Sequence, residues 1–187
     1  MAAAATDRTV GAAVPAGPCD ARRHDLELLP AAAGVVTRRV VLVCGPPAAG
    51  KTTWVAEHAA PGDRVVDLDG ICQRLGSSDS HNHPEHVRAQ ARRVRVAEET
   101  LVARMKSGTA WVIRTMPEPE RRNRHASALG ATEVVVLATA ADEARSRAAA
   151  ARRPAWTGPV IDRWWDRYRP STSRLEREIA TSQPLEG

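Results

Sequence analysis

The sequence contains no phenylalanine, one tyrosine, and only two lysines among its 27 basic residues. Its three cysteines are odd in number and form no C-x-x-C pair, which argues against structural disulfides and zinc and fits a reducing compartment. No run of apolar residues approaches the length of about 18 that a membrane-spanning helix needs. A hydrophobic content of 43% and a charged content of 26% exclude a wholly disordered or collagen-like chain. We therefore expect a folded protein that does not span a membrane.

The chain of 187 residues has about the size of one ordinary domain. Residues 1–37 are rich in Ala, Gly and Pro, and their prolines interrupt any long helix, so we expect a flexible N-terminal tail. Residues 38–170 contain the periodic segments and form the predicted domain. Residues 171–187 are expected to form a C-terminal extension, with a short, loosely held helix that starts near Ser173.

The most specific motif lies between a predicted strand and a predicted helix. Residues 39–44 form a short, β-branched run typical of a buried parallel strand. The next nine residues, GPPAAGKTT, match the phosphate-binding loop G-x-x-x-x-G-K-[ST]. Their glycines let backbone N–H groups point at phosphate oxygens, Lys51 places a charge on the β- and γ-phosphates, and Thr52 offers a hydroxyl to Mg²⁺. We therefore expect the ATP phosphates to bind to Gly45, Pro46, Pro47, Ala48, Ala49, Gly50, Lys51, Thr52 and Thr53.

A second short strand is predicted over residues 63–70, and it ends in two acids, Asp67 and Asp69. In open α/β sheets ligands bind beyond the carboxyl ends of the strands, so we expect these acids to face the phosphate loop. A carboxylate there can accept a proton from an attacking hydroxyl or bind Mg²⁺ through water. We choose Asp69 as the general base and as a Mg²⁺ ligand beside Thr52. Asp67 is expected to contact the substrate, with a role as a metal or structural partner, or capping of the following helix, as the alternatives.

Two further strand patterns, at residues 109–115 and 133–138, each precede a helical pattern, at residues 119–129 and 141–152. Alternating strands and helices predict a parallel sheet with crossover helices. The predicted fold is α/β, of the three-layer P-loop NTPase type, with four or five parallel strands flanked by helices. Arg114 follows its strand at the same rim as the loop. It is expected to hold a substrate or γ-phosphate oxygen, or else to pair with a carboxylate such as Asp69 or Glu118.

Residues 50–57, followed closely by Asp69, resemble the phosphate loop and catalytic aspartate of phage-type polynucleotide 5′-kinases. The short single domain also resembles small phosphate-loop kinases of actinobacterial phages. The polynucleotide kinase family transfers the γ-phosphate of ATP to a 5′-hydroxyl of DNA or RNA. The resemblance implies that Lys51 and Thr52 bind the nucleotide and that Asp69 is the general base.

One position departs from that family, which carries an arginine three residues after its catalytic aspartate to bind substrate phosphate. That position is Cys72 in this sequence, and Arg74 lies two residues further on. We assign substrate binding to Arg74. The departure keeps small-molecule and nucleotide kinases of the same fold open as alternatives.

The resemblance also covers an arginine-rich lid, because Arg145, Arg147, Arg152 and Arg153 precede residues 160–165 as the lid arginines of the family precede its I-D-containing helix. A planar guanidinium matches the oxygens of a transferring phosphoryl group. Arg147 is turned by about 160° from Arg145 around the helix, so the four cannot all reach one phosphate. We expect Arg147 to be catalytic and Arg152 or Arg153 to bind the nucleotide. A solvated arginine face is the alternative.

Three histidines fall within residues 81–86, but no other His or Cys lies near them in sequence, so no metal site is assigned there. A helix is predicted over residues 85–106. Between residues 85 and 125, ten basic residues face five acidic ones. A basic helix after the Asp69 strand suits the binding of an anionic or polymeric acceptor. A solvated charged face is the alternative.

Together these features predict a kinase that depends on ATP and Mg²⁺ and transfers the γ-phosphate to a hydroxyl group. The favoured acceptor is nucleic acid, with DNA preferred, at a 5′ end or at a modified base. A small-molecule or nucleotide kinase is the first alternative, and an ATPase or nucleotide-binding switch without an acceptor is the second. The second alternative would need paired acids after the third or fourth strand, and neither strand ends in acid. The expected location is the cytoplasm of a bacterium or of a phage-infected cell.

Overall fold

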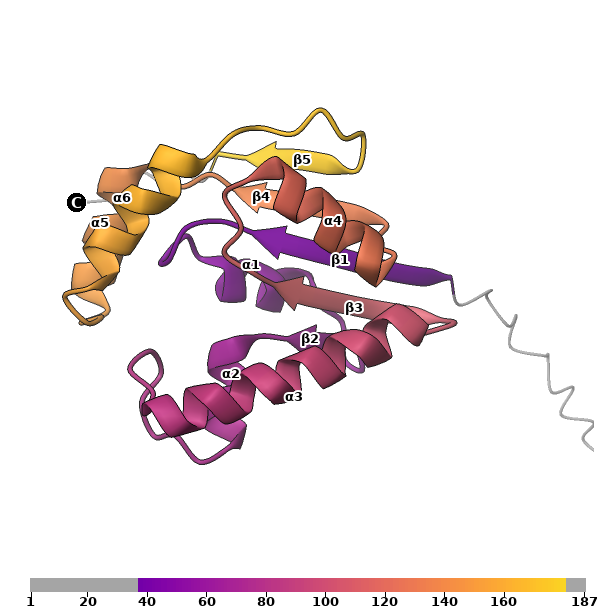
Figure 1. The fold of residues 1–187 in the computed structure, drawn as a ribbon, viewed down its shortest axis with the longest axis horizontal. Coiled ribbons are helices and arrows are strands. Elements are labelled where there is room, and N and C mark those ends of the chain that lie inside the picture. The colour runs from indigo at the N-terminus through magenta and orange to yellow at the C-terminus, as the bar shows by residue number, and fades with distance from the viewer. Residues whose placement is uncertain (1–36, 181–187) are drawn as a thin grey trace, which may run out of the picture. The chain divides into compact units, whose positions relative to one another are not determined.

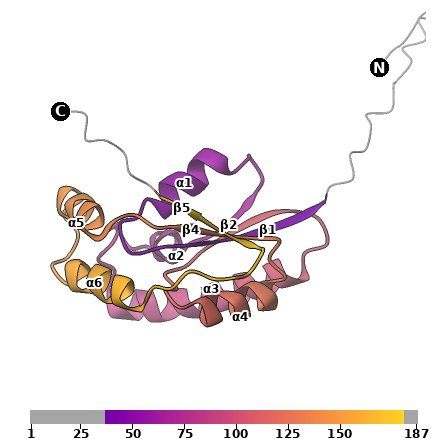
Figure 2. The same ribbon diagram turned by 90° about the horizontal axis from the view of Figure 1, so that it is seen from above.

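The computed structural model describes residues 37–180, in which a five-stranded parallel sheet carries helices on both faces (Figures 1 and 2). The strands are β1 (Arg38–Cys44), β2 (Arg64–Val66), β3 (Gly108–Ile113), β4 (Glu133–Leu137) and β5 (Glu176–Ile179). The helices are α1 (Lys51–His58), α2 (Leu68–Arg74), α3 (Glu85–Arg104), α4 (Pro119–Leu129), α5 (Ala141–Ala150) and α6 (Thr157–Arg167). The tail expected over residues 1–37 lies, apart from Thr37, outside the described residues, as do residues 181–187. None of the helices within residues 37–180 is both long and apolar enough to cross a membrane.

The strands follow the order β2-β3-β1-β4-β5, and every neighbouring pair is parallel. Strand β1 lies at the centre because residues 40–44 are apolar on both sides and fully buried, as a central parallel strand requires. The chain leaves β1 at the point where the sheet grows in two directions, toward β3 on one side and β4 on the other. Ligands bind at such a switch point, beyond the carboxyl ends of the strands. The predicted α/β P-loop NTPase fold is confirmed.

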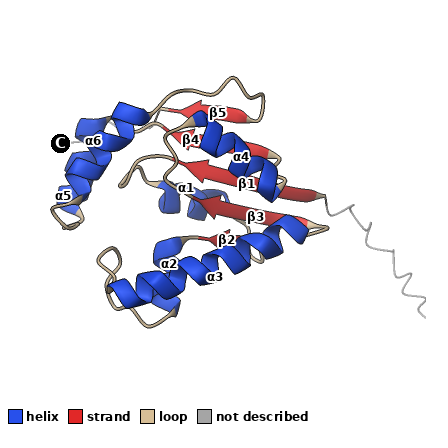
Figure 3. Ribbon diagram, viewed as in Figure 1, coloured by secondary structure: helices blue, strands red, loops and turns tan. Residues whose placement is uncertain are grey.

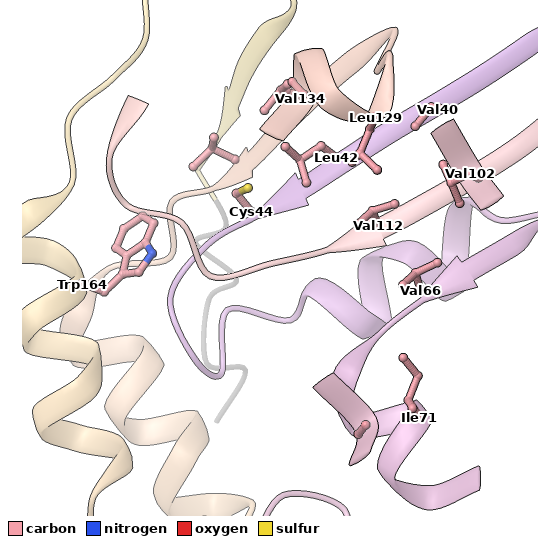
Figure 4. Packing of buried hydrophobic residues seen from close by; sticks show 14 of the residues in the cluster. Val40, Leu42, Cys44, Val66, Ile71, Val102, Val112, Leu129, Val134 and Trp164 are labelled. Atoms are coloured by element: carbon pink, nitrogen blue, oxygen red, sulfur yellow. The ribbon is translucent and has the colours of Figure 1, made fainter. Parts of the chain in front are cut away.

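Alternate residues of the sheet build two separate cores. On one face, Val40 and Leu42 pack with Val102 of α3 and Leu129 of α4 (Figure 4). On the other face, Val41, Val43 and Trp111 of the sheet pack with Val55 of α1. This alternation explains the three layers, because each side of a buried strand must be covered by a helix.

The second strand is shorter than expected, and its end differs from the prediction. Strand β2 stops at Val66, and α2 begins at Leu68, so Asp69 lies in the first turn of a helix and not at a strand tip. The reason is the spacing of Leu68, Ile71 and Cys72, which pack into the core from one face of a helical turn. Asp67 occupies the N-cap position of α2, as the capping alternative expects, and the backbone N–H groups of Gly70 and Asp69 act to lower the pKa of its carboxyl.

The helix expected near Ser173 is also wrong, because residues 176–179 form strand β5 (Figure 3). This strand pairs in parallel with β4, from Val134 opposite Glu176 to Leu137 opposite Ile179. Contacts distant in sequence hold it there. The carboxylate of Glu176 accepts two hydrogen bonds from the fully buried guanidinium of Arg122, at 2.8 and 2.9 Å. In residues 176–179, strand pairing with β4 and the contact with Arg122 outweigh the local preference for a helix.

Candidate active site

The phosphate loop joins the end of β1 to the first residue of α1, and two of its positions require glycine. Gly50 precedes α1 with a φ of 81°, a left-handed conformation that favours glycine. A Cβ atom on Gly45 would lie 2.6 Å from the carbonyl oxygen of Leu137, so no side chain fits there. Ala48 also has a positive φ, 59°, which for a residue with a side chain stores strain of the kind found at ligand-binding loops. The backbone of this loop is therefore held in one unusual shape.

The ammonium group of Lys51 is buried under this loop. Its Nζ donates to the carbonyl oxygen of Pro46 at 2.6 Å and to that of Gly45 at 3.1 Å. Burial lowers the pKa of Lys51 to about 8, although the nearby carboxylates of Asp67 and Asp69 favour the charged form. A buried cation with a lowered pKa gains stabilisation from an incoming anion, so the position is suited to phosphate.

A cavity of about 650 Å³ opens beside the loop, at the carboxyl ends of β1, β2 and β3. Its size lies within the range of small-molecule sites. The predicted site residues that line it are Pro47, Ala48, Ala49, Gly50, Lys51, Thr52, Thr53, Asp67, Asp69, Arg114 and Arg153. The predicted residues that do not line it are Gly45, Pro46, Arg74, Arg147 and Arg152. Gly45 and Pro46 still belong to the site, because their carbonyls hold Lys51.

The two acids face the cavity in different environments. Burial, and then the neighbouring charge of Asp69, raises the pKa of Asp67 above its usual value. Asp69 is more open, with its side chain 41% exposed. Two histidines from the loop between α2 and α3 contact it: His81 Nδ1 lies 3.3 Å from Oδ2, and His83 Nε2 lies 3.4 Å from Oδ1. The cluster of histidines was visible in the sequence. Its contact with Asp69 could not be predicted, because that contact depends on the shape of the loop between α2 and α3.

The residues present fit a magnesium ion bound together with a nucleotide. Thr52 and Asp69 both line the cavity, and they offer a hydroxyl and a carboxylate oxygen, the donor type that Mg²⁺ prefers. Within residues 37–180 no group of three His, Cys, Asp or Glu side chains could hold a metal ion. Mg²⁺ takes one or two protein oxygens together with substrate phosphates, so the pair of oxygens is sufficient.

Arginines from two elements form a basic wall on the far side of the cavity, and we use this name for Arg88, Arg95 and Arg114. Arg114 is mostly buried, and its Nε lies 3.4 Å from Glu99, so it pairs with a carboxylate as the alternative expects, although not with Asp69 or Glu118. Arg95 lies 3.9 Å from the same carboxylate. Burial raises the pKa of Glu99, but His125, Arg114 and Arg95 overcome this and hold the pKa below its usual value. One carboxylate thus faces two guanidinium groups and an imidazole, so Arg95 and Arg114 together keep a net positive charge in the wall.

Arg74 points elsewhere. Its guanidinium pairs with Glu98 at 2.6 Å, its side chain is 54% exposed, and it does not line the cavity. The structure therefore separates Arg74 from the other predicted substrate ligands. Arg88 and Arg95 line the cavity where a substrate-binding arginine was expected. The signal for them in the sequence was the basic composition of the predicted helix over residues 85–106.

The four predicted lid arginines differ in position. Arg153 lines the cavity, and burial lowers its pKa while the charges of Asp69 and Asp67 oppose that shift. Arg147 lies beside Gly50 of the loop but pairs with Glu143 of its own helix. Arg152 has a positive φ of 47° after the end of α5 and lines a second cavity of about 360 Å³.

Arg145 binds two carboxylates, those of Asp142 and Asp162, and does not line the main cavity. Trp156 and Val160 do line it, from the start of α6 and the turn before it. The segment between α5 and α6 and the beginning of α6 thus form one wall of the cavity, opposite α2 and the histidine loop. In this structure Arg153 is the lid arginine that faces the two acids.

This fold and this loop define a P-loop nucleotide-binding protein of the kinase-like class. The chain belongs to the AAA domain family AAA_33, whose profile matches residues 40–173, from the strand before the phosphate loop to beyond α6.

Solved structures share the fold, and two of them overlap most of this chain. A protein from Chloroflexus aurantiacus described as a candidate kinase superposes with a TM-score of 0.56 and 16% identity, over 80% of this chain and 91% of its own. A sugar kinase from Janibacter sp. superposes with a TM-score of 0.52 and 15% identity, over 78% of this chain and 87% of its own. At these identities the likeness concerns the fold. No curated protein sequence matches the chain.

Proposed function

We propose that the protein is an ATP-dependent phosphotransferase that moves the γ-phosphate to a hydroxyl group of an acceptor. The observation that carries this proposal is the joint placement of Lys51 and Asp69 on one cavity, a phosphate-binding cation on one side and a carboxylate on the other. A triphosphate on the loop leaves the rest of the cavity for an acceptor between the loop and the basic wall. Kinase-like structural neighbours agree with this class of reaction.

On the donor side, the loop backbone and Lys51 bind the phosphates of the nucleotide. Lys51 exchanges the carbonyls of Gly45 and Pro46 for phosphate oxygens, which are stronger, charged acceptors. Thr52 and Asp69 would hold Mg²⁺, which would supply neutralising charge to the phosphates of the nucleotide. Arg153 lies opposite the acids and stabilises the equatorial oxygens of the transferred group.

On the acceptor side, Asp69 takes the proton of the attacking hydroxyl. Its carboxylate is partly exposed to the cavity and belongs to a helix that is rooted in the core through Ile71 and Cys72. Burial and the neighbouring charge of Asp69 raise the pKa of Asp67, so Asp67 lies deeper in the protein than the proposed base. Asp67 then serves as a hydrogen-bonding partner of bound groups at the bottom of the cavity.

The acceptor we favour is a nucleic-acid hydroxyl, with DNA preferred. The basic wall lies on the acceptor side and attracts phosphates that flank a 5′-hydroxyl. A small-molecule acceptor is the second candidate, and the cavity volume of about 650 Å³ together with the fold shared with a sugar kinase favours it. The two candidates differ in salt dependence, because each neutralised phosphate of a polymer releases counterions.

Transfer of labelled γ-phosphate tests the proposal. The protein is incubated with ATP and Mg²⁺ and with DNA, RNA, nucleosides or sugars, and label on the acceptor is measured. Replacing Asp69 with Asn is expected to lower transfer by about 10²-fold, because it removes the general base, while ATP binding persists. Label on DNA supports the favoured acceptor, and label on small molecules alone overturns it. ATP hydrolysis without label on any acceptor, unchanged in Asp69→Asn, would refute the phosphotransferase proposal.

A further inference from the structure

The loop between α2 and α3 folds back onto α2. It thereby brings the imidazoles of His81 and His83 to the carboxylate of Asp69. His81 Nδ1 lies 3.3 Å from Oδ2 of Asp69, and His83 Nε2 lies 3.4 Å from Oδ1. Each oxygen therefore faces a different ring nitrogen. Both histidines line the cavity together with Asp69, so the contact is made inside the candidate active site.

The ring of His83 is fixed in place. Its side chain is 3% exposed, and its Nδ1 lies 2.8 Å from the hydroxyl of Ser77 at the start of the loop. Its Nε2 is buried and makes no regular hydrogen bond within residues 37–180, so Asp69 is the anion at which it points. In a neutral ring, the proton sits on Nε2 and faces Asp69 when the Ser77 hydroxyl donates to Nδ1; in a charged ring, both nitrogens donate. A buried donor is thereby directed at the carboxylate.

His81 is placed by a separate device. The carboxylate of Asp79 accepts hydrogen bonds from the backbone N–H groups of His81, at 2.7 Å, and Asn82, at 2.8 Å. This bonding fixes the turn locally, as Asp side chains commonly do in turns. The side chain of His81 is 28% exposed and reaches the second oxygen of Asp69. Hydrogen bonds to Asp79 and Ser77 thus fix the shape of the loop, and neither of them involves Asp69.

We propose that His81 and His83 are positioning residues that hold the Asp69 carboxylate in the orientation needed for proton abstraction, one imidazole on each oxygen. Asp69 stands in the first turn of α2 with its side chain 41% exposed, where an unsupported carboxylate would sample several rotamers. Displacing a reacting group by about 1 Å can cost about 10²-fold in rate, so fixing this rotamer matters for catalysis. Each carboxylate oxygen keeps a further lone pair, which leaves one for the acceptor hydroxyl and one for Mg²⁺. The inference rests on the proposed role of Asp69 as the base.

The first test does not depend on catalysis. NMR of protein labelled with ¹⁵N-histidine reports which ring nitrogen of His83 is protonated. A proton on Nε2 is expected, with the Nδ1 signal changing in Ser77→Ala. An Nε2 without a proton overturns the proposal, because His83 would then present a lone pair to the carboxylate.

The second test is kinetic and compares His83→Ala with His83→Gln, which keeps an N–H donor at a similar reach. His83→Ala is expected to lower kcat of phosphoryl transfer about tenfold without changing KM for ATP, and His83→Gln is expected to recover most of that loss. In an Asp69→Asn background, His83→Ala should have no further effect, because the group that it positions is gone. His86→Ala is the matched control, since His86 is exposed and does not line the cavity.

The outcomes separate the two proposals. An equal loss of kcat in both backgrounds, or a loss confined to KM for ATP, overturns the positioning role. Wild-type protein that transfers no phosphate to any acceptor contradicts the proposed function instead. The protonation state of His83 then still decides whether the imidazole donates to Asp69.

Discussion

The two halves of the cavity are constructed differently. The donor half is one run of nine residues, from Gly45 after β1 to Thr53 in the first turn of α1, and we expect most of its contacts with a phosphate to come from the backbone. The acceptor half is assembled from side chains of α2, the histidine loop, α3 and the end of β3, which are far apart in sequence. A backbone cradle tolerates few changes, because its shape depends on glycines at fixed positions. A set of separate charged side chains can be altered one at a time, so acceptor preference is the property more open to change.

The largest effect is expected in the donor half. Lys51→Ala should lower ATP turnover by about 10³-fold, because a buried positive charge no longer faces the developing charge on the phosphates. Lys106→Ala is the matched control, since Lys106 is the only other lysine and is exposed. Steady-state ATP turnover measures both variants. Equal activity of Lys51→Ala and Lys106→Ala would show that the loop does not bind the reacting nucleotide.

A smaller and more selective effect is expected in the acceptor half. Arg114→Gln should raise KM for the acceptor about tenfold and leave KM for ATP unchanged, because one charge-assisted contact is lost. Arg74→Gln, which alters an arginine outside the cavity, should change neither constant. For a nucleic-acid acceptor, Arg114→Gln should also reduce the salt dependence of binding by about one unit of slope. The opposite pattern, with Arg74 selective and Arg114 silent, would place the acceptor outside the basic wall.

The smallest expected effect is the uptake of a proton by the donor half when ATP binds. Lys51 loses its proton at about pH 8 in the free protein, and bound phosphates favour its charged form. ATP binding above this pH should therefore take up a proton, approaching one per nucleotide near about pH 9, and affinity should fall as the pH rises. Calorimetry in buffers of different ionisation enthalpy measures the uptake. Lys51→Arg should abolish it, because arginine stays charged throughout this range; uptake that persists in this variant would assign it to another group.

Predictability follows the same division between the two halves. The donor half could be predicted because strand, loop and helix are adjacent in sequence; the strand and the helix each begin one residue earlier than expected, and the helix ends earlier, at His58. The acceptor half could be located only as a basic helix near two acids. Asp69 proved to be helical because Leu68, Ile71 and Cys72 pack as one turn, and a pattern of three residues is too short to distinguish helix from strand.

The remaining differences have a common physical origin. Sequence spacing shows which residues share a helix face, but not which charge on another element neutralises them. Arg147 was expected to be free for phosphate, yet it pairs with Glu143 one helical turn away. The fifth strand depends on Glu176 meeting Arg122, 54 residues away in sequence, and no local pattern carries that information.

The pair of Arg122 and Glu176 determines where this domain can be truncated at its C-terminal side. Arg122 is fully buried, and besides Glu176 its guanidinium donates to the carbonyl oxygens of Met116, at 3.1 Å, and Arg169, at 2.7 Å. A fragment that stopped after α6 would strand an uncompensated charge in the interior, at a cost of about 3–5 kcal/mol. It would also expose the hydrogen-bonding edge of β4, and an exposed strand edge promotes aggregation. For expression and crystallisation alike, the smallest usable unit of this protein therefore ends beyond Ile179.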